Sequence, residues 1–491
     1  MAYLKELLKD VTYVCTKGTP NIRVTHICHD SRQVQKGSMF LCLMGAREDG
    51  HRYLDEAVRR GAAVCVVSRN VYVKENVTVI RVRDTSRALA VIAGNFYGRP
   101  AERMTVIGIT GTKGKTTTAY MLWRIMNEAG ISTGLMGTLG IQFPDGRCLE
   151  SSNTTPDALV IQSHLRKMAD AGCTCCVMEV SSQGLKHHRV DGIAFALGIF
   201  TNLSEDHIGP AEHKNMTEYA RCKKMLLARS RCVLLNADDT SARFMASGIR
   251  ADLFTYGLGR NTDFGAQDIR YYREGARLAM AYRIKGCSRQ DIRLGMPGQP
   301  NVYNSLAAFA AAHLMGIDDA VTVQALSRVR VKGRIEEVES KGDYHIIVDY
   351  AHNAVSLEEL LHTLRLYEPK RLVVLFGCGG NRSPLRRIQM GQVAGRLADM
   401  TILTSDNPRD EDPLTIISHI RRGMEETGGS YRVIPDRREA IAYAVTHALT
   451  GDMIVVTGKG HEAYQEIAGR RYPMDDRRMI EQMIESHIRG E

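Results

Sequence analysis

Short apolar runs alternate with longer amphipathic segments along most of the chain. Five runs rich in Val, Ile, Leu and Phe cover residues 104–110, 174–180, 194–201, 232–236 and 252–256. Helical patterns separate them, as at 157–171 and 215–229. The alternation predicts a parallel sheet with helices on both faces. Segment 262–295 departs from it and indicates an antiparallel accessory region.

Similar patterns flank this central part. Strand-like pieces at 38–44 and 62–67 surround a helix near 51–60, which predicts a small α/β domain. Residues 97–100, Tyr-Gly-Arg-Pro, are typical of a linker because Gly and Pro both interrupt regular structure. Further along, the alternation resumes with four buried strands. We therefore expect an α/β protein of three domains, covering residues 1–100, 101–331 and 332–491.

Composition narrows the class of protein. At 491 residues the chain is long enough for about three domains, each with its own core. No run approaches the ~20 apolar residues of a membrane span, and the N-terminus does not resemble a signal peptide. The twelve cysteines lack zinc-ligand spacing, which favours reduced thiols and a cytoplasmic location. The basic residues are dispersed, so a net charge of +10 fits anion-binding pockets better than nucleic acid.

The most informative stretch is 104–120, MTVIGITGTKGKTTTAY. A β-branched strand pattern runs directly into the glycine-rich turn 111–117, and a helical pattern follows. Glycines let backbone N–H groups approach an anion, and a helix N-terminus favours negative charge. We expect Lys115 to reach the outer phosphates of a nucleoside triphosphate and the Thr116 hydroxyl to bind Mg²⁺. The motif is one glycine short of its usual form, because Ile109 occupies the first position.

Polar side chains follow other predicted strands of the same sheet. Glu179 lies at the end of one strand and His207 shortly after the next. Because the carboxyl ends of parallel strands meet at one edge of a sheet, we expect both side chains near Lys115, as ligands of Mg²⁺. Lys223 and Lys224 lie together on a predicted helix, where two lysines normally form a solvated face. The four C-terminal strands also end in charged or glycine-rich loops, which predicts one clustered site.

Taken together, the motifs resemble those of the Mur ligases. In chain order they are TGTKGKTTT, NTTPD (153–157), MEVSSQGL (178–185), NLSEDH (202–207), GRIE (333–336), DYAHN (349–353), GCGGNR (377–382), DNPR (406–409) and GKGHE (458–462). The resemblance implies a three-domain fold, with a central P-loop-type ATPase domain and a C-terminal Rossmann-like domain. It also implies an ATP-dependent enzyme that extends the peptide of a peptidoglycan precursor. DSR near the start, together with DNPR, resembles the members that add meso-diaminopimelate to UDP-N-acetylmuramoyl-L-alanyl-D-glutamate.

The family mechanism implies roles for single residues. ATP would phosphorylate the γ-carboxylate of D-glutamate, the amine of the incoming amino acid would attack the acyl phosphate, and phosphate would leave. The catalytic residues would be Lys115, Glu179, His207 and Lys223. The Mg²⁺ ligands would be Thr116, Glu179, His207 and Lys223, the lysine as a carbamate. The spacing YxxxK favours Lys223 over Lys224 for this modification, although the sequence leaves both open.

The resemblance also implies which residues contact each substrate. All the substrates are small molecules, and we expect the protein to act as a monomer. ATP would contact Gly111, Thr112, Lys113, Gly114, Lys115, Thr116, Thr117, Asn304, Arg334, Asp349 and His352. UDP-muramoyl-dipeptide would contact Ser31, Ala46, Arg47, Glu48, Asn153, Thr154, Thr155, Ser181, His187 and Arg189. Diaminopimelate would contact Arg382, Asp406, Asn407, Pro408, Arg409, Gly458 and Glu462.

The choice of amino acid has a physical argument. meso-Diaminopimelate is lysine with one more carboxylate at its far end, and an arginine fork pairs a carboxylate in a bidentate way that a lysine ammonium cannot. Arg409 supplies the fork, and Glu462 offers an acceptor for the far ammonium. L-lysine would then leave a buried Arg409 unpaired, and sites built on polar pairing reject such analogues by roughly 10⁴–10⁵-fold.

Three other interpretations remain. They are a sister ligase that uses L-lysine or another amino acid, a Mur-like protein that binds nucleotide without catalysis, and a nucleic-acid-binding P-loop protein. Arg409 argues against the first, and retention of the four catalytic candidates argues against the second. The chain also departs from the family pattern at Lys113, Pro300 and Ala354, where asparagine, phenylalanine and proline are usual, and in the loop after His207.

Overall fold

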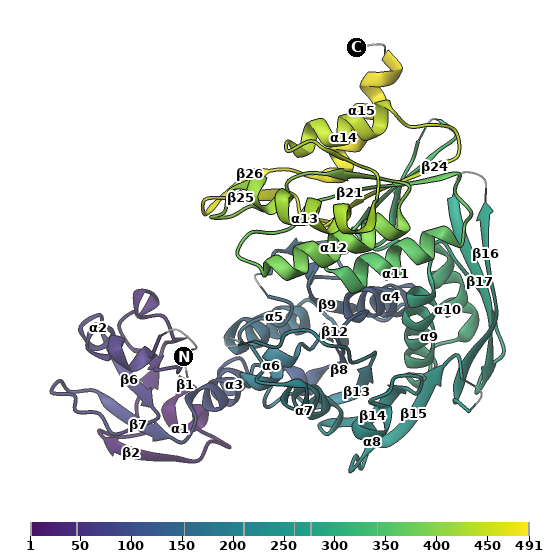
Figure 1. Cartoon of the computed structure of the whole chain (residues 1–491). Helices are drawn as coiled ribbons and strands as arrows, with labels where there is room; N and C mark the ends of the chain where they lie inside the picture. Colours follow the sequence, from purple (N-terminus) through teal and green to yellow (C-terminus); the bar gives the residue numbers. More distant parts are fainter. Residues whose placement is uncertain are drawn as a thin grey trace. The chain divides into compact units, whose positions relative to one another are not determined.

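The fold is α/β throughout, and a computed structural model describes residues 2–45, 48–151, 153–209, 212–259, 261–274, 277–340 and 342–489. It divides into two compact units, residues 1–265 with 303–322, and residues 266–302 with 323–491 (Figure 1). No helix in these described ranges is long and apolar enough to cross a membrane. All twelve cysteines are free thiols.

The N-terminal part of the first unit is built on a five-stranded sheet. Its order is β2-β7-β6-β5-β4, with all neighbours parallel except β2 and β7. The strands are β2 (Tyr13–Lys17), β4 (His26–Cys28), β5 (Ser38–Leu41), β6 (Ala62–Val67) and β7 (Thr78–Val82). Successive residues of β5 enter different cores: Met39 packs with helix α3 (Thr85–Phe96), and Phe40 packs with α2 (Leu54–Arg59). The strands are apolar runs because both faces of the sheet are buried.

The central part of the same unit confirms the predicted parallel sheet. Its parallel strands lie in the order β9-β12-β8-β13-β14-β15, so β8, which leads into the glycine-rich turn, lies in the interior of the sheet. They are β8 (Thr105–Thr110), β9 (Thr133–Gly137), β12 (Cys175–Glu179), β13 (Phe195–Phe200), β14 (Ser230–Asn236) and β15 (Asp252–Gly257). The helices include α4 (Lys115–Glu128), α5 (Ala158–Asp170), α6 (Ser182–Lys186), α7 (Met216–Leu227) and α8 (Ala242–Ala246).

The accessory segment predicted at 262–295 is made of β16 (Phe264–Glu274), β17 (Arg277–Gly286) and β18 (Asp291–Leu294). The antiparallel prediction is confirmed for β17 with β18. Two helices follow, α9 (Gln299–Leu314) and α10 (Asp319–Arg328). Pro300 lies in the first turn of α9, where a proline costs no intrahelical hydrogen bond, so this departure from the family pattern is compatible with the helix.

The C-terminal sheet carries the four buried strands that the sequence predicted. Its order is β19-β20-β24-β21-β22-β23, and only the β19–β20 pair is antiparallel. The strands are β19 (Glu336–Val338), β20 (His345–Asp349), β21 (Arg371–Phe376), β22 (Met400–Leu403), β23 (Tyr431–Val433) and β24 (Asp452–Thr457). One face packs on α11 (Ala354–Arg365), α12 (Pro384–Leu397) and α13 (Pro413–Thr427), and the other on α14 (Arg437–Thr446) and α15 (Asp476–Arg489) (Figure 1). A hairpin, β25 (Tyr464–Ile467) with β26 (Arg470–Pro473), precedes α15.

A fully buried ion pair fixes α14 and α15 to the ends of two strands. Arg437 donates to both carboxylate oxygens of Asp476 at 2.8 and 2.6 Å, and both side chains have no exposed surface. The same guanidinium donates to the carbonyl oxygens of Ser405, two residues after β22, and of Thr457, the last residue of β24. The loops at the ends of β22 and β24 carry residues predicted to bind the amino acid. The Arg437–Asp476 pair therefore helps to hold those loops in place.

We expect Asp476→Ala to destabilise the protein by about 3–5 kcal/mol, because Arg437 would remain as a buried charge without its partner. Urea unfolding followed by circular dichroism measures the change. Glu481→Gln is the matched control, since Glu481 pairs with Arg477 on the surface of the same helix and its loss should cost less than about 1 kcal/mol. A loss below about 1 kcal/mol for Asp476→Ala would contradict the interpretation.

Candidate active site

The glycine-rich turn joins β8 to α4, with Gly114 as the N-terminal cap residue of the helix. The Lys115 ammonium turns back onto the turn and donates to the carbonyl oxygens of Gly111 and Thr112 at 2.8 and 2.9 Å. A Cβ at Gly111 would lie 1.8 Å from the Thr201 hydroxyl oxygen, and its φ of 153° also favours glycine. The turn is therefore packed tightly against the loop that follows β13.

Thr116 and Glu179 are brought together as the sequence predicted. The Thr116 hydroxyl donates to a carboxylate oxygen of Glu179 at 2.8 Å, and Glu179 is only 2% exposed. The backbone N–H of Thr138 donates to the other carboxylate oxygen at 2.7 Å. Thr116 lies in the first turn of α4, and Glu179 ends β12, next to β8, so the register of the parallel sheet sets this contact.

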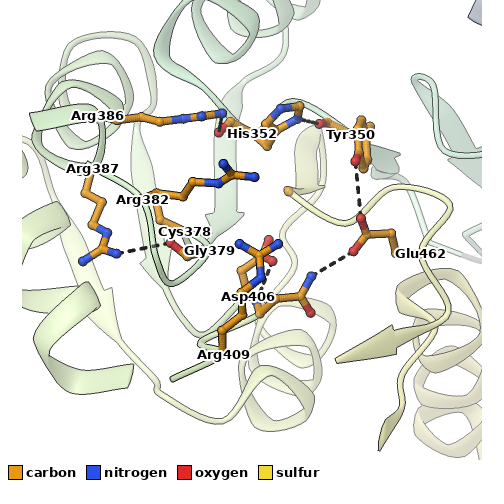
Figure 2. A pocket seen from close by; sticks show the side chains of 13 residues that line it. Tyr350, His352, Cys378, Gly379, Arg382, Arg386, Arg387, Asp406, Arg409 and Glu462 are labelled. Atoms are coloured by element: carbon orange, nitrogen blue, oxygen red, sulfur yellow. Dashed lines mark hydrogen bonds between the residues drawn. The ribbon is translucent and has the colours of Figure 1, made fainter. Parts of the chain in front are cut away.

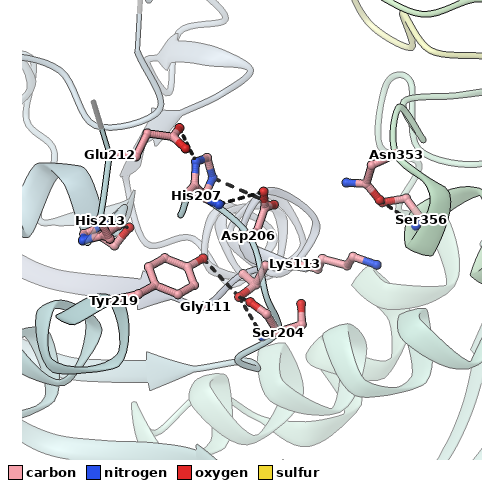
Figure 3. A network of polar contacts seen from close by, with 12 residues as sticks. Gly111, Lys113, Ser204, Asp206, His207, Glu212, His213, Tyr219, Asn353 and Ser356 are labelled. Atoms are coloured by element: carbon pink, nitrogen blue, oxygen red, sulfur yellow. Dashed lines mark hydrogen bonds and ion pairs between the residues drawn. The ribbon is translucent and has the colours of Figure 1, made fainter. Parts of the chain in front are cut away.

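His207 lies in a second polar network of the same unit (Figure 3). Its Nδ1 is 3.0 Å from a carboxylate oxygen of Glu212, and its ring lies 6.1 Å from that of Tyr219. The Tyr219 hydroxyl shares a 3.1 Å hydrogen bond with the Thr112 hydroxyl in the glycine-rich turn. Among the described residues no group of three His, Cys, Asp or Glu side chains is arranged to hold a metal, so His207 is not gathered with Glu179 into such a group.

The two neighbouring lysines of α7 differ sharply in environment. Lys223 is 1% exposed and donates to the Gly111 carbonyl oxygen at 2.6 Å. Burial, with Lys115 close by, lowers the pKa of Lys223 well below its usual value. Lys224 instead donates to the Phe244 carbonyl and the Ser247 hydroxyl at the surface.

A third cluster follows β12. The Thr155 hydroxyl donates to the Glu179 carbonyl oxygen and to the Ser181 hydroxyl, both at 3.0 Å. Arg189 donates to the Thr155 carbonyl oxygen at 2.8 Å, and Thr154 bonds Thr138, which also contacts Glu179. Predicted dipeptide residues thus lie in one network with Glu179. His187 follows α6, and partial burial lowers its pKa.

The remaining predicted residues of the first unit occupy separate places. The Ser31 hydroxyl donates to Glu56 at 2.9 Å, and Glu48 accepts from the Tyr53 hydroxyl at 3.0 Å. Ala46 and Arg47 lie outside the described residues. Asn304, on α9, accepts a 3.3 Å hydrogen bond from the Thr118 hydroxyl of α4, which connects it to the helix of the glycine-rich turn.

In the second unit, Asp349 is the last residue of β20, and Arg334 lies close by, next to Ile335, whose N–H donates to Asp349. The Arg334 guanidinium stacks 4.8 Å from the centre of the Tyr350 ring. Asp349 is 8% exposed, accepts backbone N–H groups from Ile335 and Ala351 at 2.8 and 2.7 Å, and has a pKa raised by burial.

A polar pocket opens at the carboxyl ends of β20, β21, β22 and β24 (Figure 2). Six of the seven residues predicted for the amino acid line it, and the exception is Pro408. The pocket also includes His352, which was predicted to contact the nucleotide. Figure 2 shows the guanidinium groups of Arg382 and Arg409 and the Glu462 carboxylate around a common space. Its walls thus present cationic and anionic groups together.

The loop Asp406–Arg409 is held in a demanding conformation. Arg409 has a φ of 52°, which is uncommon for a residue with a side chain. Gly380 approaches this loop so closely that a Cβ would lie 1.9 Å from the Pro408 carbonyl oxygen. Backbone strain of this kind clusters at functional sites.

The sequence argument about Arg409 was wrong in one respect. It required a buried guanidinium without a protein partner, whereas Arg409 is 29% exposed and its Nε is 3.2 Å from a Glu466 carboxylate oxygen. Its Nη1 donates to the Gly380 carbonyl oxygen at 2.9 Å. L-lysine would therefore not leave this arginine unpaired, and rejection on that basis is weaker than the sequence argument stated.

Several residues of the pocket and its support were not predicted. Lys459 is fully buried, donates to the Asn407 side-chain oxygen at 3.1 Å and lies 3.6 Å from Glu462. Arg387, 1% exposed, donates to both oxygens of Glu411 at 2.8 Å. Lys459 lies inside the GKGHE motif, so its position was visible in the sequence. Nothing in the sequence near Arg387 or Glu466 indicated their partners.

Comparison with known proteins decides the family. Three family descriptions match successive parts of the chain: "Mur ligase family, catalytic domain" at 23–97, "Mur ligase middle domain" at 109–312, and "Mur ligase, glutamate ligase domain" at 333–460. A Caldanaerobacter subterraneus protein named UDP-N-acetylmuramoyl-L-alanyl-D-glutamate--2,6-diaminopimelate ligase is 39% identical over 98% of this chain and 98% of its own length. The chain belongs to the Mur ligase family.

Other relatives agree with this assignment. A Geobacillus kaustophilus protein of the same name is 41% identical over 94% of both chains. A solved structure titled with that name has a TM-score of 0.71 and 28% identity, covering 99% of both chains. The predicted resemblance and the three-domain Mur ligase fold are confirmed. Mur ligases are ATP-dependent ligases, and this enzyme is one of them.

The residues around Thr116 fit a magnesium ion. Thr116 and Glu179 place a hydroxyl and a carboxylate oxygen 2.8 Å apart, and Mg²⁺ binds hard oxygen donors together with substrate phosphates. The ion would neutralise phosphate charge there. The Lys223 amine offers no oxygen donor unless it is modified.

We expect Gly111→Ala to weaken binding of ATP to this Mur ligase by at least about tenfold, because the new Cβ would displace the loop after β13. Isothermal titration calorimetry with a non-hydrolysable ATP analogue and Mg²⁺ measures the affinity. Gly146→Ala is the control, since Gly146 also has a positive φ but has open space around it. Equal affinities for the two variants would contradict the steric argument.

Proposed function

We propose that this Mur ligase adds meso-diaminopimelate to the D-glutamate γ-carboxylate of UDP-N-acetylmuramoyl-L-alanyl-D-glutamate, using ATP. The observation that carries the proposal is the polar pocket that Arg409 lines. It combines arginines with the carboxylates of Asp406 and Glu462. A substrate with a carboxylate and an ammonium at its far end matches this mixture of charges. The relatives of similar length carry the corresponding name.

The protein would support this reaction mainly by positioning the substrates and much less by covalent catalysis. The D-glutamate carboxylate attacks the γ-phosphorus of ATP and gives an acyl phosphate and ADP. The amine of diaminopimelate then attacks the acyl carbon, phosphate leaves, and the amine loses a proton. Lys115, at the start of α4, would neutralise phosphate charge, and the first turn of the helix would direct backbone N–H groups toward that charge. Mg²⁺ at Thr116 and Glu179 would supply further neutralisation.

We assign substrate roles to the other residues from the hydrogen-bond networks in which they lie. The cluster of Thr155, Ser181 and Arg189 would hold the muramoyl-dipeptide beside Glu179, so that its carboxylate reaches the γ-phosphate. Ser31 and the loop near Glu48 would hold the uridine portion. Asn304, Arg334, Asp349 and His352 would contact ATP. We further propose that the three predicted domains perform these separate tasks, and that the enzyme works as a cytoplasmic monomer without nucleic acid.

We also propose that Lys223 is the carbamylated lysine. A carbamate forms from a neutral amine and CO₂, with loss of a proton, so a lysine of lowered pKa is favoured. Lys223 has such a pKa and faces the glycine-rich turn, whereas Lys224 faces the surface. The carbamate oxygens would replace a buried positive charge with donors suited to Mg²⁺. His207 would lie at the edge of this site.

Substrate use tests the proposed function directly. With ATP, Mg²⁺ and UDP-N-acetylmuramoyl-L-alanyl-D-glutamate, we expect phosphate release that depends on meso-diaminopimelate and is much slower with L-lysine. The physical reason is the carboxylate that only diaminopimelate offers to the arginines. A coupled phosphate assay and mass spectrometry of the product measure the reaction. Equal kcat/KM for the two amino acids would support the sister ligase that uses L-lysine, and no release with either would support a protein that only binds nucleotide.

The neighbouring lysines give a matched pair of variants. We expect Lys223→Ala to lower kcat by at least about 100-fold, in the range of lost electrostatic stabilisation, while Lys224→Ala changes it little. Wild-type enzyme depleted of CO₂ should lose activity and regain it with bicarbonate. The carbamate carbon should appear by ¹³C NMR after labelling with ¹³C-bicarbonate. Loss of this signal in Lys224→Ala, but not in Lys223→Ala, would reverse the assignment.

A further inference from the structure

The β25–β26 hairpin is attached to the loop that carries Arg409. The Arg409 N–H donates to the Glu466 carbonyl oxygen at 3.0 Å, and the Ala468 N–H donates to the Arg409 carbonyl oxygen at 2.8 Å. The Glu466 N–H donates to the Asn407 side-chain oxygen at 2.9 Å. Gln465 donates to the Asp406 carbonyl oxygen at 2.6 Å. These bonds fix the backbone of Glu466 relative to Arg409.

From this fixed position, the side chain of Glu466 contacts the guanidinium of Arg409. Its carboxylate accepts from the Arg409 Nε at 3.2 Å, and the two side chains are 32% and 29% exposed. Opposite Glu466 in the hairpin lies Arg471, whose guanidinium stacks 4.3 Å from the centre of the Tyr464 ring. The Arg409 Nη1 is held by the Gly380 carbonyl oxygen. Two of the three guanidinium nitrogens, Nε and Nη1, are thus held by the protein, and Arg409 lines the pocket.

We infer that Glu466 is a specificity-determining residue that sets how strongly Arg409 holds the far carboxylate of the amino-acid substrate. The inference rests on the proposed function, because it assigns that carboxylate to Arg409. A carboxylate already paired with Arg409 weakens the attraction of the guanidinium for a second one. The same negative charge favours an amino acid that carries a net positive charge, such as L-lysine. Glu466 therefore lowers the preference for diaminopimelate while it orients the arginine.

The charge and the orienting contact can be separated by two substitutions. Glu466→Gln keeps an oxygen that accepts from the Arg409 Nε and removes the charge. We expect the KM for meso-diaminopimelate to fall about three- to tenfold, since the competing pair is exposed and of moderate strength. The KM for L-lysine should stay unchanged or rise, and kcat should change less than about twofold. Glu466→Ala also removes the contact, so its KM for diaminopimelate should be higher than that of Glu466→Gln.

One control variant and two contrary outcomes test the inference about Glu466. Glu481→Gln removes one surface charge from α15 and should leave every KM unchanged. An unchanged or higher KM for diaminopimelate in Glu466→Gln would overturn the inference. Equal KM values in Glu466→Gln and Glu466→Ala would overturn the orienting part. Failure of the proposed function is distinguishable, because wild-type enzyme would then release no phosphate with diaminopimelate.

A double-mutant cycle shows whether Glu466 acts through Arg409. Arg409→Met keeps the aliphatic stem and removes the guanidinium, so the KM for diaminopimelate should rise. In that background Glu466→Gln should no longer lower the KM, because the competition has lost its target. A fall of equal size in both backgrounds would assign the effect to the general field of the pocket and would overturn the inference.

Discussion

The carbonyl oxygen of Gly111 accepts hydrogen bonds from two ammonium groups, those of Lys115 and Lys223. This one oxygen connects the turn after β8 with α4 and α7, so the geometry of the glycine-rich turn depends on it. Burial lowers the pKa of Lys223, and repulsion from the neighbouring Lys115 lowers it further. A bound phosphate, or the proposed carbamate on Lys223, would relieve the repulsion, since each adds negative charge.

The pocket proposed for the amino acid relies on a different arrangement, in which ion pairs of two buried arginines hold loops rather than substrate. Arg387 with Glu411 and Arg437 with Asp476 fix the loops after β21, β22 and β24 from behind. Charges that are paired and hydrogen-bonded inside the protein do not compete for the ligand, and they limit the movement of their loops.

The sequence predicted most of the fold because the strands are buried on both faces and so appear as uninterrupted apolar runs. Strand β9 was missed, since Gly134 and Gly137 interrupt its short apolar segment. Motif residues such as Glu179 and Arg409 were found because each lies at or just after the carboxyl end of a strand. Their partners were not, because the contact between Arg409 and Glu466 depends on how a hairpin aligns with a distant loop. The choice between Lys223 and Lys224 likewise needed the rotation of α7, which turns one lysine inward and the next outward.

Pairing within the pocket changes how its selectivity should be understood. If Arg409 had no protein partner, binding the wrong amino acid would leave a desolvated charge, and discrimination would be very large. Arg409 instead has Glu466 and Gly380, and Glu462 has Asn407 and Lys459 within reach. Binding of a substrate therefore exchanges one set of polar contacts for another, and only the difference between the two sets contributes to affinity. Selectivity of this kind is moderate at each residue and accumulates over several of them. It is also adjustable, because a change in one partner at the rim, such as Glu466, shifts the balance without touching the residue that contacts the substrate.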